Sequence, residues 1–145
     1  MTERQEWDVF MLLCDYAEEM NGKLYIMGGG WSRAMISSEA PLNMALAIKL
    51  SVPWNESNRR HAVTVRLLQE NFEPATFGEN GEEIRLSYNV EVGRPPGIRP
   101  GSYLDAPLAA RFQGLALPAG IYLWEFAING RMLKRVPFEV MAPQQ

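Results

Sequence analysis

The sequence predicts an all-β fold, a single immunoglobulin-like β-sandwich in which about eight strands form two antiparallel sheets. Apolar and polar residues alternate with a period of two along much of the chain, and turn-forming residues interrupt this pattern about every ten to twenty positions. No stretch keeps a helical period over about ten residues. Because neither a repeat nor a linker is present, residues 1–145 are expected to form one domain.

The N-terminal part predicts a strand over about residues 6–14 and a short strand at 23–27. Asn21-Gly22 lies just before the second strand, and both residues of an Asn-Gly pair tolerate the positive φ angles of a tight turn. Residues 17–20 have the composition of one helical turn. We therefore expect a strand, a single helical turn and a second strand here.

Three central segments alternate in the manner of strands with one buried face. The clearest covers 84–92, and 63–67 repeats the pattern. Residues 44–50 alternate large apolar side chains with small or polar ones. Each segment is expected to turn one face to a core and the other to water.

The C-terminal part predicts a hairpin. Alternating residues 122–128 lead into Asn129-Gly130, and a second alternating run follows at 132–140. The Asn-Gly pair favours a type I′ turn between the two strands. Since Pro137 cannot donate a ladder hydrogen bond, the last strand is expected at a sheet edge.

Composition excludes several classes of protein. Seventeen acidic and fourteen basic residues give a net charge of −3 without a run of Lys or Arg, which argues against nucleic-acid binding. The charged N-terminus is followed by only about eight apolar residues, too few for a membrane span or a signal peptide. Cys14 is the only cysteine and cannot form an internal disulfide. We expect a cytoplasmic protein that is not associated with a membrane.

No catalytic, metal or cofactor site is predicted, so we expect a protein that is not an enzyme. His61 is the only histidine and is expected at a solvated strand end. Adjacent carboxylates, as in Glu18-Glu19, point to opposite faces of a strand and cannot act as an acid–base pair. The glycines at 28–30 do not lead into a helix, which disfavours a phosphate site. They are expected to permit a bulge while Trp31 plugs the end of the sandwich.

The segment 93–107 is the main candidate for a binding loop. It is longer than most connections between strands, and long ordered loops are commonly functional. Its prolines are expected to hold it in an extended, polyproline-like form. The candidate partner-binding residues are Arg94, Pro95, Pro96, Ile98, Arg99 and Tyr103. A structural strap that crosses between the two sheets is the alternative.

Two strands carry apolar residues on both faces, at 9–14 and at 121–124. A sandwich strand needs only one apolar face, so a loop, a second copy or another protein is expected to cover the other. Phe10, Leu12 and Leu123 are the candidate contact residues. Coverage by the 93–107 segment would explain both features at once.

These features favour a non-catalytic interaction or assembly module. It would associate with itself as a homo-oligomer, or dock on another protein, through a sheet face and the 93–107 loop. The alternative is a small-molecule or carbohydrate binder that uses Trp31, Trp54 and Tyr103, whose rings could stack on a ligand.

The chain also resembles a family of short bacterial proteins of unknown function, largely actinobacterial. The resemblance implies a bacterial origin, a single β-sandwich domain and no assigned activity. It spans nearly the whole chain and is carried by turn and loop motifs: Lys23-Leu24-Tyr25-Ile26 with Gly28-Gly29-Gly30-Trp31, Val52-Pro53-Trp54-Asn55 with Asn58-Arg59-Arg60-His61, Val92-Gly93-Arg94-Pro95-Pro96-Gly97, and Pro118-Ala119-Gly120-Ile121-Tyr122.

Overall fold

The computed structural model describes residues 5–36, 41–77 and 79–143, and this part of the chain is nearly all β-structure in several sheets. The all-β prediction is confirmed. The helical structure among these residues is a single 3₁₀ turn, η1, at Trp54–Glu56. In the same ranges, no helix has the length and apolarity needed to cross a membrane.

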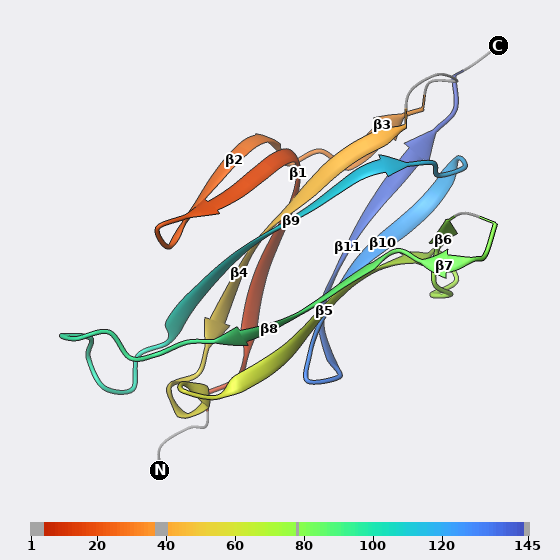
Figure 1. Cartoon of the computed structure of the whole chain (residues 1–145). Helices are drawn as coiled ribbons and strands as arrows, with labels where there is room; N and C mark the ends of the chain where they lie inside the picture. Colours follow the sequence, from red (N-terminus) through yellow and green to blue (C-terminus); the bar gives the residue numbers. More distant parts are fainter. Residues whose placement is uncertain (1–4, 37–40, 78, 144–145) are drawn as a thin grey trace.

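Two large sheets form the body of the molecule (Figure 1). The four-stranded sheet has the order β2-β1-β4-β9 and consists of β1 (Asp8–Met20), β2 (Lys23–Gly29), β4 (Leu42–Val52) and β9 (Leu104–Leu115). The five-stranded sheet has the order β3-β11-β10-β5-β8, curls into a half-barrel, and consists of β3 (Arg33–Met35), β5 (Arg60–Gln69), β8 (Arg85–Glu91), β10 (Gly120–Ile128) and β11 (Arg131–Met141). A small hairpin adds β6 (Thr76–Phe77) and β7 (Glu82–Glu83).

One apolar core joins the two large sheets. Leu13 and Ile48 from the four-stranded sheet lie in the same buried cluster as Val65 from the five-stranded sheet. Across the sheets, Phe112 stacks on Trp124 with ring centroids 4.2 Å apart. Burying one large apolar side chain contributes about 1.5–3 kcal/mol to stability. The apolar residues that alternate in the sequence are those that each strand buries between the two sheets.

Two parts of the chain differ from expectation. Residues 17–20 do not form a helical turn, because they continue β1 and pair with β2, as in Ala17 opposite Ile26. Strand β9 was not predicted, and its residues 104–107 belonged to the expected loop. Proline, glycine and several alanines hide its alternation. The described residues hold eleven strands, against about eight expected.

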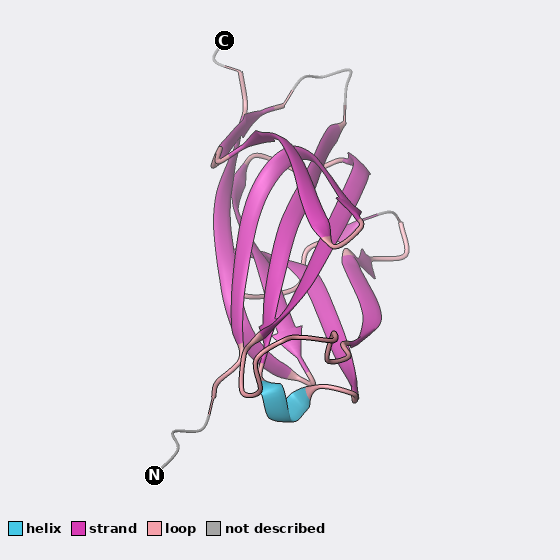
Figure 2. Cartoon of the chain, turned by 90° about the vertical axis from the view of Figure 1, so that its left-hand side faces the viewer, coloured by secondary structure: helices cyan, strands magenta, loops and turns pink. Residues whose placement is uncertain are grey.

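The β1–β2 hairpin covers the outer face of the four-stranded sheet. Residues 8–14 of β1 pair with β4, whereas residues 14–20 pair with β2 and leave the plane of the sheet (Figures 1 and 2). A second apolar cluster forms under the hairpin from Cys14, Ala17, Ala45 and Ala47, with Leu12, Leu24 and Ala109 packed against it. These small side chains let the hairpin approach the sheet closely.

The turns predicted at Asn21-Gly22 and Asn129-Gly130 are confirmed, and the first is of type I′ like the second. The φ angles are 52° and 77° at Asn21 and Gly22, and 49° and 83° at Asn129 and Gly130. Pro137 lies in the part of β11 that pairs with β10 alone among the described strands, because parallel strand β3 reaches only residues 139–141. Pro137 thus lies in an open part of β11, but the last strand is not the edge strand that was expected, because β3 lies beyond its C-terminal end.

Candidate functional site

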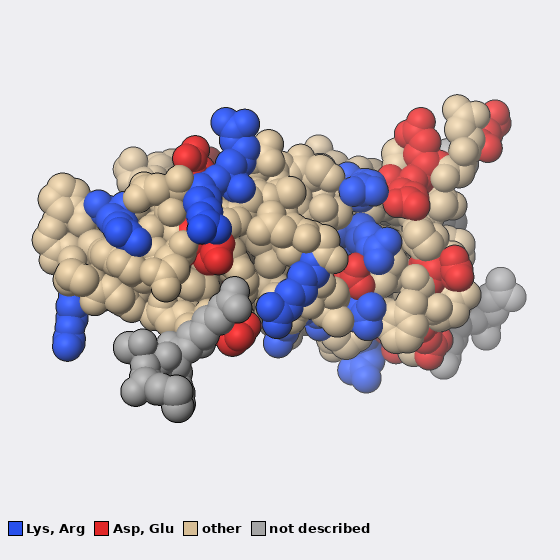
Figure 3. Space-filling model, turned by 90° about the horizontal axis from the view of Figure 1, so that it is seen from below, with Lys and Arg blue, Asp and Glu red and all other residues tan. Residues whose placement is uncertain are grey.

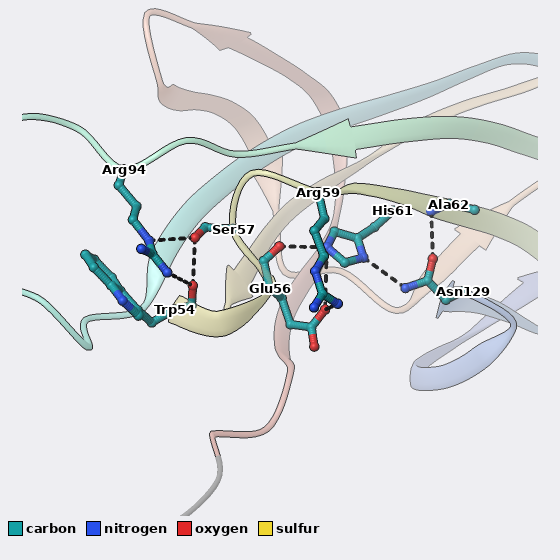
Figure 4. A network of polar contacts seen from close by, with 8 residues as sticks. All are labelled: Trp54, Glu56, Ser57, Arg59, His61, Ala62, Arg94 and Asn129. Atoms are coloured by element: carbon teal, nitrogen blue, oxygen red, sulfur yellow. Dashed lines mark hydrogen bonds and ion pairs between the residues drawn. The ribbon is translucent and has the colours of Figure 1, made fainter.

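The base of the 93–107 loop is fixed to the turn that contains η1 (Figure 4). The guanidinium of Arg94 lies 4.0 Å from the centre of the Trp54 ring. Its Nε donates to Ser57 Oγ at 2.8 Å and its Nη2 to the Trp54 carbonyl at 2.9 Å, while Ser57 Oγ donates to the same carbonyl at 2.7 Å. Arg94, predicted to bind a partner, thus uses its side chain to hold its own chain.

Two further residues anchor the loop to the N-terminal segment. Gln5 donates to the Gly101 carbonyl at 2.7 Å and accepts from the Trp54 backbone N–H at 2.9 Å. Tyr103 donates its hydroxyl to the Glu6 carbonyl at 2.8 Å. The loop base therefore has the character of a strap, which joins the end of β8 to the start of β9.

The prolines at 95, 96 and 100 lie in turns and not in a polyproline helix, and Pro107 belongs to β9. Ile98 N–H donates to the Pro95 carbonyl across Pro96-Gly97, and Ser102 N–H donates to the Arg99 carbonyl across Pro100-Gly101. Both glycines have positive φ, 85° and 84°, as type II turns require. Between these turns Ile98 packs half-buried against the core, while the other predicted contact residues of the loop tip stay exposed: Pro95, Pro96 and Arg99.

His61 is buried, which contradicts its expected solvated position. Its side chain is 5% exposed and its ring packs edge-on against Trp7 at 4.8 Å. Nε2 lies 2.8 Å from the Glu56 carbonyl and Nδ1 lies 3.0 Å from Asn129 Nδ2 (Figure 4). Because the amide donates to Nδ1, the proton of the neutral ring is on Nε2, and both nitrogens have structural partners.

The three aromatic residues of the predicted ligand site do not meet. Trp54 and Tyr103 lie at the end of the molecule that holds η1. Trp31 lies at the opposite end, where it packs edge-on against Phe138 at 6.5 Å. Trp31 is half-buried and fills the space beside β3, as expected of a plug.

The other predicted contact residues also lie far apart. Phe10 and Leu12 are on the outer face of the four-stranded sheet, whereas Leu123 is on the outer face of the five-stranded sheet. The chain's own β1–β2 hairpin covers the apolar outer face around Leu12. Phe10 remains 52% exposed, while Leu12 and Leu123 are half-buried.

The β1–β2 hairpin carries the residues that sequence reasoning missed. Its solvent-facing side presents Tyr16, Met20, Tyr25 and Met27, which are 41%, 49%, 53% and 68% exposed. Tyr16 lies directly opposite Met27, whereas Tyr25 lies opposite Glu18 and Met20 opposite Lys23, so the four side chains share one face of the hairpin with two charged residues. Tyr and Met are enriched in protein interfaces. Residues 24–27 are all apolar and 17–20 were expected to form a helical turn, so the sequence did not show which side chains face solvent.

β2 is also the least protected edge strand. Natural sheets blunt their edges with charges, prolines or very short strands. β8 carries Arg85 and Glu91, β9 contains Pro107, the open part of β11 contains Pro137, and β3 has three residues. In contrast, β2 has one charge, Lys23, at its first position, and six residues follow without a charge or a proline.

Acidic and basic side chains are mixed on the surface of the molecule (Figure 3). In Figure 3 both basic and acidic side chains occur across the view, and more of the acidic ones lie on the right, where β6 and β7 lie in Figure 1. No three His, Cys, Asp or Glu side chains in the described ranges could hold a metal ion. Burial raises the pKa of the Cys14 thiol, which opposes formation of a reactive thiolate.

Comparisons with known proteins identify a family. The model of a family of unknown function, DUF6941, matches residues 9–141. No curated protein matches the chain. A similar solved structure is Pseudomonas fluorescens alkylpurine DNA glycosylase AlkC bound to DNA containing an abasic site analog, with a TM-score of 0.49 and 10% identity. The match covers 94% of this chain and 31% of the glycosylase chain, so this chain spans about a third of that protein. The chain belongs to the DUF6941 family of unknown function.

Proposed function

We propose that this protein is a non-catalytic interaction module that binds an extended segment of another protein by strand addition at the edge of β2. The observation that carries the proposal is the combination, in one hairpin, of an unprotected edge and a face with four exposed Tyr and Met side chains. Strand addition takes its affinity from backbone hydrogen bonds and its specificity from alternating side chains.

The two-residue turn between β1 and β2 determines which backbone groups of β2 have no partner in β1. In a hairpin with a two-residue turn, the residues that flank the turn, Met20 and Lys23, exchange both hydrogen bonds. Because hydrogen-bonded and non-hydrogen-bonded residue pairs alternate along an antiparallel ladder, the backbone N–H and C=O groups of Leu24 and Ile26 point away from β1. An incoming strand would pair with these groups and lay every second side chain beside Tyr25 and Met27.

Charge complementarity specifies the partner. The hairpin carries Asp15, Glu18 and Glu19 against the single base Lys23. A segment that alternates apolar residues with Lys or Arg would therefore bind better than one with acidic residues, and a second copy would bring two acidic hairpins together. The proposed occupant is a basic, apolar, extended segment of another protein.

We also propose a role for the scaffold, a role for the 93–107 loop and a cellular location. The two packed sheets serve as an immunoglobulin-like scaffold that displays the hairpin. The exposed turns of the 93–107 loop form a secondary contact for a partner already held at β2. The protein acts in the cytoplasm, in keeping with its single, buried cysteine.

The test compares two substitutions at one position. Displayed random peptides of about twelve residues are selected on the intact protein, and the selected peptides are then titrated against Ile26→Pro and Ile26→Ala. Proline removes the outward N–H and is tolerated on the solvent side of an edge strand, whereas alanine keeps that N–H. We expect selected peptides to alternate apolar and basic residues and to bind the proline variant roughly tenfold or more weakly, and the alanine variant within about fivefold.

Two outcomes would contradict the proposal. One is failure to select peptides, or equal binding of the selected peptides to wild type and Ile26→Pro. The other is sedimentation of the wild type as a dimer that Ile26→Pro dissociates, which would make a second copy the occupant. Thermal unfolding of both variants checks that the fold is retained.

A further inference from the structure

A cavity of about 440 Å³ lies at the end of the molecule that holds η1, away from the β1–β2 hairpin. Six of its eight lining residues are polar or charged, and the full lining is Gln5, Glu6, Trp7, Pro53, Asn55, Glu56, Arg59 and Arg131. Its volume falls within the range of small-molecule sites, about 300–1,000 Å³. The strand-addition proposal does not involve these residues.

The walls of the cavity are held by contacts outside it. Gln5 is fixed between Trp54 and Gly101, and the ring of Trp7 packs against buried His61. Arg131 directly follows the type I′ turn of β10 and β11. A site whose backbone is already ordered loses little conformational entropy when a ligand binds.

The charged side chains in the cavity are, by contrast, loosely paired. Arg131 lies 3.5 Å from Glu6, with both side chains about two-thirds exposed, and Arg59 lies 3.5 Å from Glu56 (Figure 4). Elsewhere Glu125, 5% exposed, is held by Arg66 and Arg135 at 2.8 and 2.9 Å. An exposed ion pair such as that of Arg131 and Glu6 contributes about 0–1 kcal/mol to stability, so its two charges remain available to a ligand.

Because the walls of the cavity are ordered while its charges are only weakly paired, we propose that the cavity binds a zwitterionic small molecule of the α-amino acid class. The ligand carboxylate pairs with Arg131, its ammonium group pairs with Glu6, and an apolar side chain packs on Trp7 and Pro53. Two opposed charges within one small cavity match a ligand that carries both signs. A purely anionic or cationic ligand would face an uncompensated like charge.

The experiment uses L-phenylalanine as the probe. Uniformly ¹⁵N-labelled protein is titrated to about 50 mM ligand, and the indole N–H signal of Trp7, identified by its loss in Trp7→Phe, is followed. Two analogues lack one charge each: 3-phenylpropionate lacks the ammonium group and phenethylamine lacks the carboxylate. We expect a saturable shift with L-phenylalanine and at least about tenfold weaker binding of either analogue.

Matched substitutions locate the binding. Arg131→Gln and Glu6→Gln are expected to weaken L-phenylalanine binding about fivefold or more. Arg33→Gln is the control, because Arg33 forms an equally long, exposed ion pair of 3.5 Å with Glu139 near the other end of β11. Equal binding of the three compounds, equal weakening by Arg33→Gln, or no saturable shift would overturn the proposal.

Discussion

Arg94 lies across the face of the Trp54 ring at 4.0 Å and donates a hydrogen bond to the carbonyl of the same tryptophan. One guanidinium thus holds both the side chain and the backbone of a residue forty positions earlier. Stacking of a cation on an aromatic ring contributes about 0.5–1 kcal/mol at exposed sites, and a hydrogen bond to a charged group about 1.5–3 kcal/mol. The conformation of the 93–107 loop depends on this contact.

Arg94→Lys is expected to loosen the loop although it keeps the charge. Lysine lacks the planar fork that donates to Ser57 and Trp54 while stacking. We expect the free energy of unfolding in urea to fall by about 1–2 kcal/mol and proteolysis between residues 93 and 103 to become faster. Arg99→Lys, at an exposed position of the same loop, should change stability by less than about 0.5 kcal/mol. Equal effects of the two substitutions would refute the anchoring role.

His61→Ala is expected to destabilise the fold strongly. The substitution leaves the Asn129 amide and the Glu56 carbonyl without their partner and opens a space beside Trp7. Buried polar groups that lose their partners, together with a cavity, typically cost about 2–4 kcal/mol. Urea unfolding measures the loss, and Arg60→Ala at the exposed neighbouring position serves as the control. A loss below about 1 kcal/mol would show that the buried histidine is dispensable.

Tyr88→Phe is expected to stabilise the protein. The buried hydroxyl of Tyr88 has no hydrogen-bond partner within the described residues, and burial raises its pKa to about 12. Removing an unsatisfied buried hydroxyl should raise the free energy of unfolding by about 1 kcal/mol at pH 7. Tyr122→Phe, which removes a hydroxyl that donates to the Pro118 carbonyl at 2.7 Å, should lower it.

The same tyrosine predicts a pH dependence. The unfolded chain loses the phenolic proton near pH 10, whereas the folded protein keeps it until about pH 12. The folded state therefore binds more protons between these values, and its stability falls as the pH rises from about 10 to 12. Below about pH 9 the contribution is constant. Urea unfolding at a series of alkaline pH values should show a smaller decline in Tyr88→Phe than in the wild type.

Glu125→Gln is expected to destabilise the five-stranded sheet. Glu125 is buried between Arg66 and Arg135, and the substitution leaves two guanidinium groups without an anion. Both arginines are about one-third exposed, so water compensates in part and we expect a loss of about 2 kcal/mol. Glu139→Gln, in an exposed pair with Arg33, should have little effect. If both substitutions proved neutral in thermal unfolding, the triad would not contribute to stability.

Local sequence signals predicted those elements whose structure depends on local physics. The two Asn-Gly turns and the position of Pro137 follow from the φ angles and donors of single residues. Strand β9 was missed because its pairing with β4 is a long-range contact that its composition does not reveal. Likewise, the prolines in the loop were expected to extend the chain, but glycines at 97 and 101 allow turns instead.

The candidate contact surface could not be predicted for the same reason. Sequence indicates that Phe10, Leu12 and Leu123 lie on faces not needed for a single core, but not that these faces point in opposite directions. It also predicts a short strand at 23–27 without showing that this strand ends a sheet. A strand is an edge strand when no other strand pairs with its second side, and this depends on the arrangement of all strands in the sheet.

The small residues beneath the β1–β2 hairpin affect how easily the hairpin can separate from the sheet. Ala45, Ala47 and Ala109 bury little area each, so the hairpin is held to the sheet far more weakly than the core strands are held to one another. Lifting the hairpin would expose Cys14 and leave the main core intact. We therefore expect the β1–β2 hairpin to open locally as a unit while the rest of the molecule stays folded. Amide protons of residues 15–29 should exchange with solvent through local opening, well before those of β10 and β5 exchange through global unfolding.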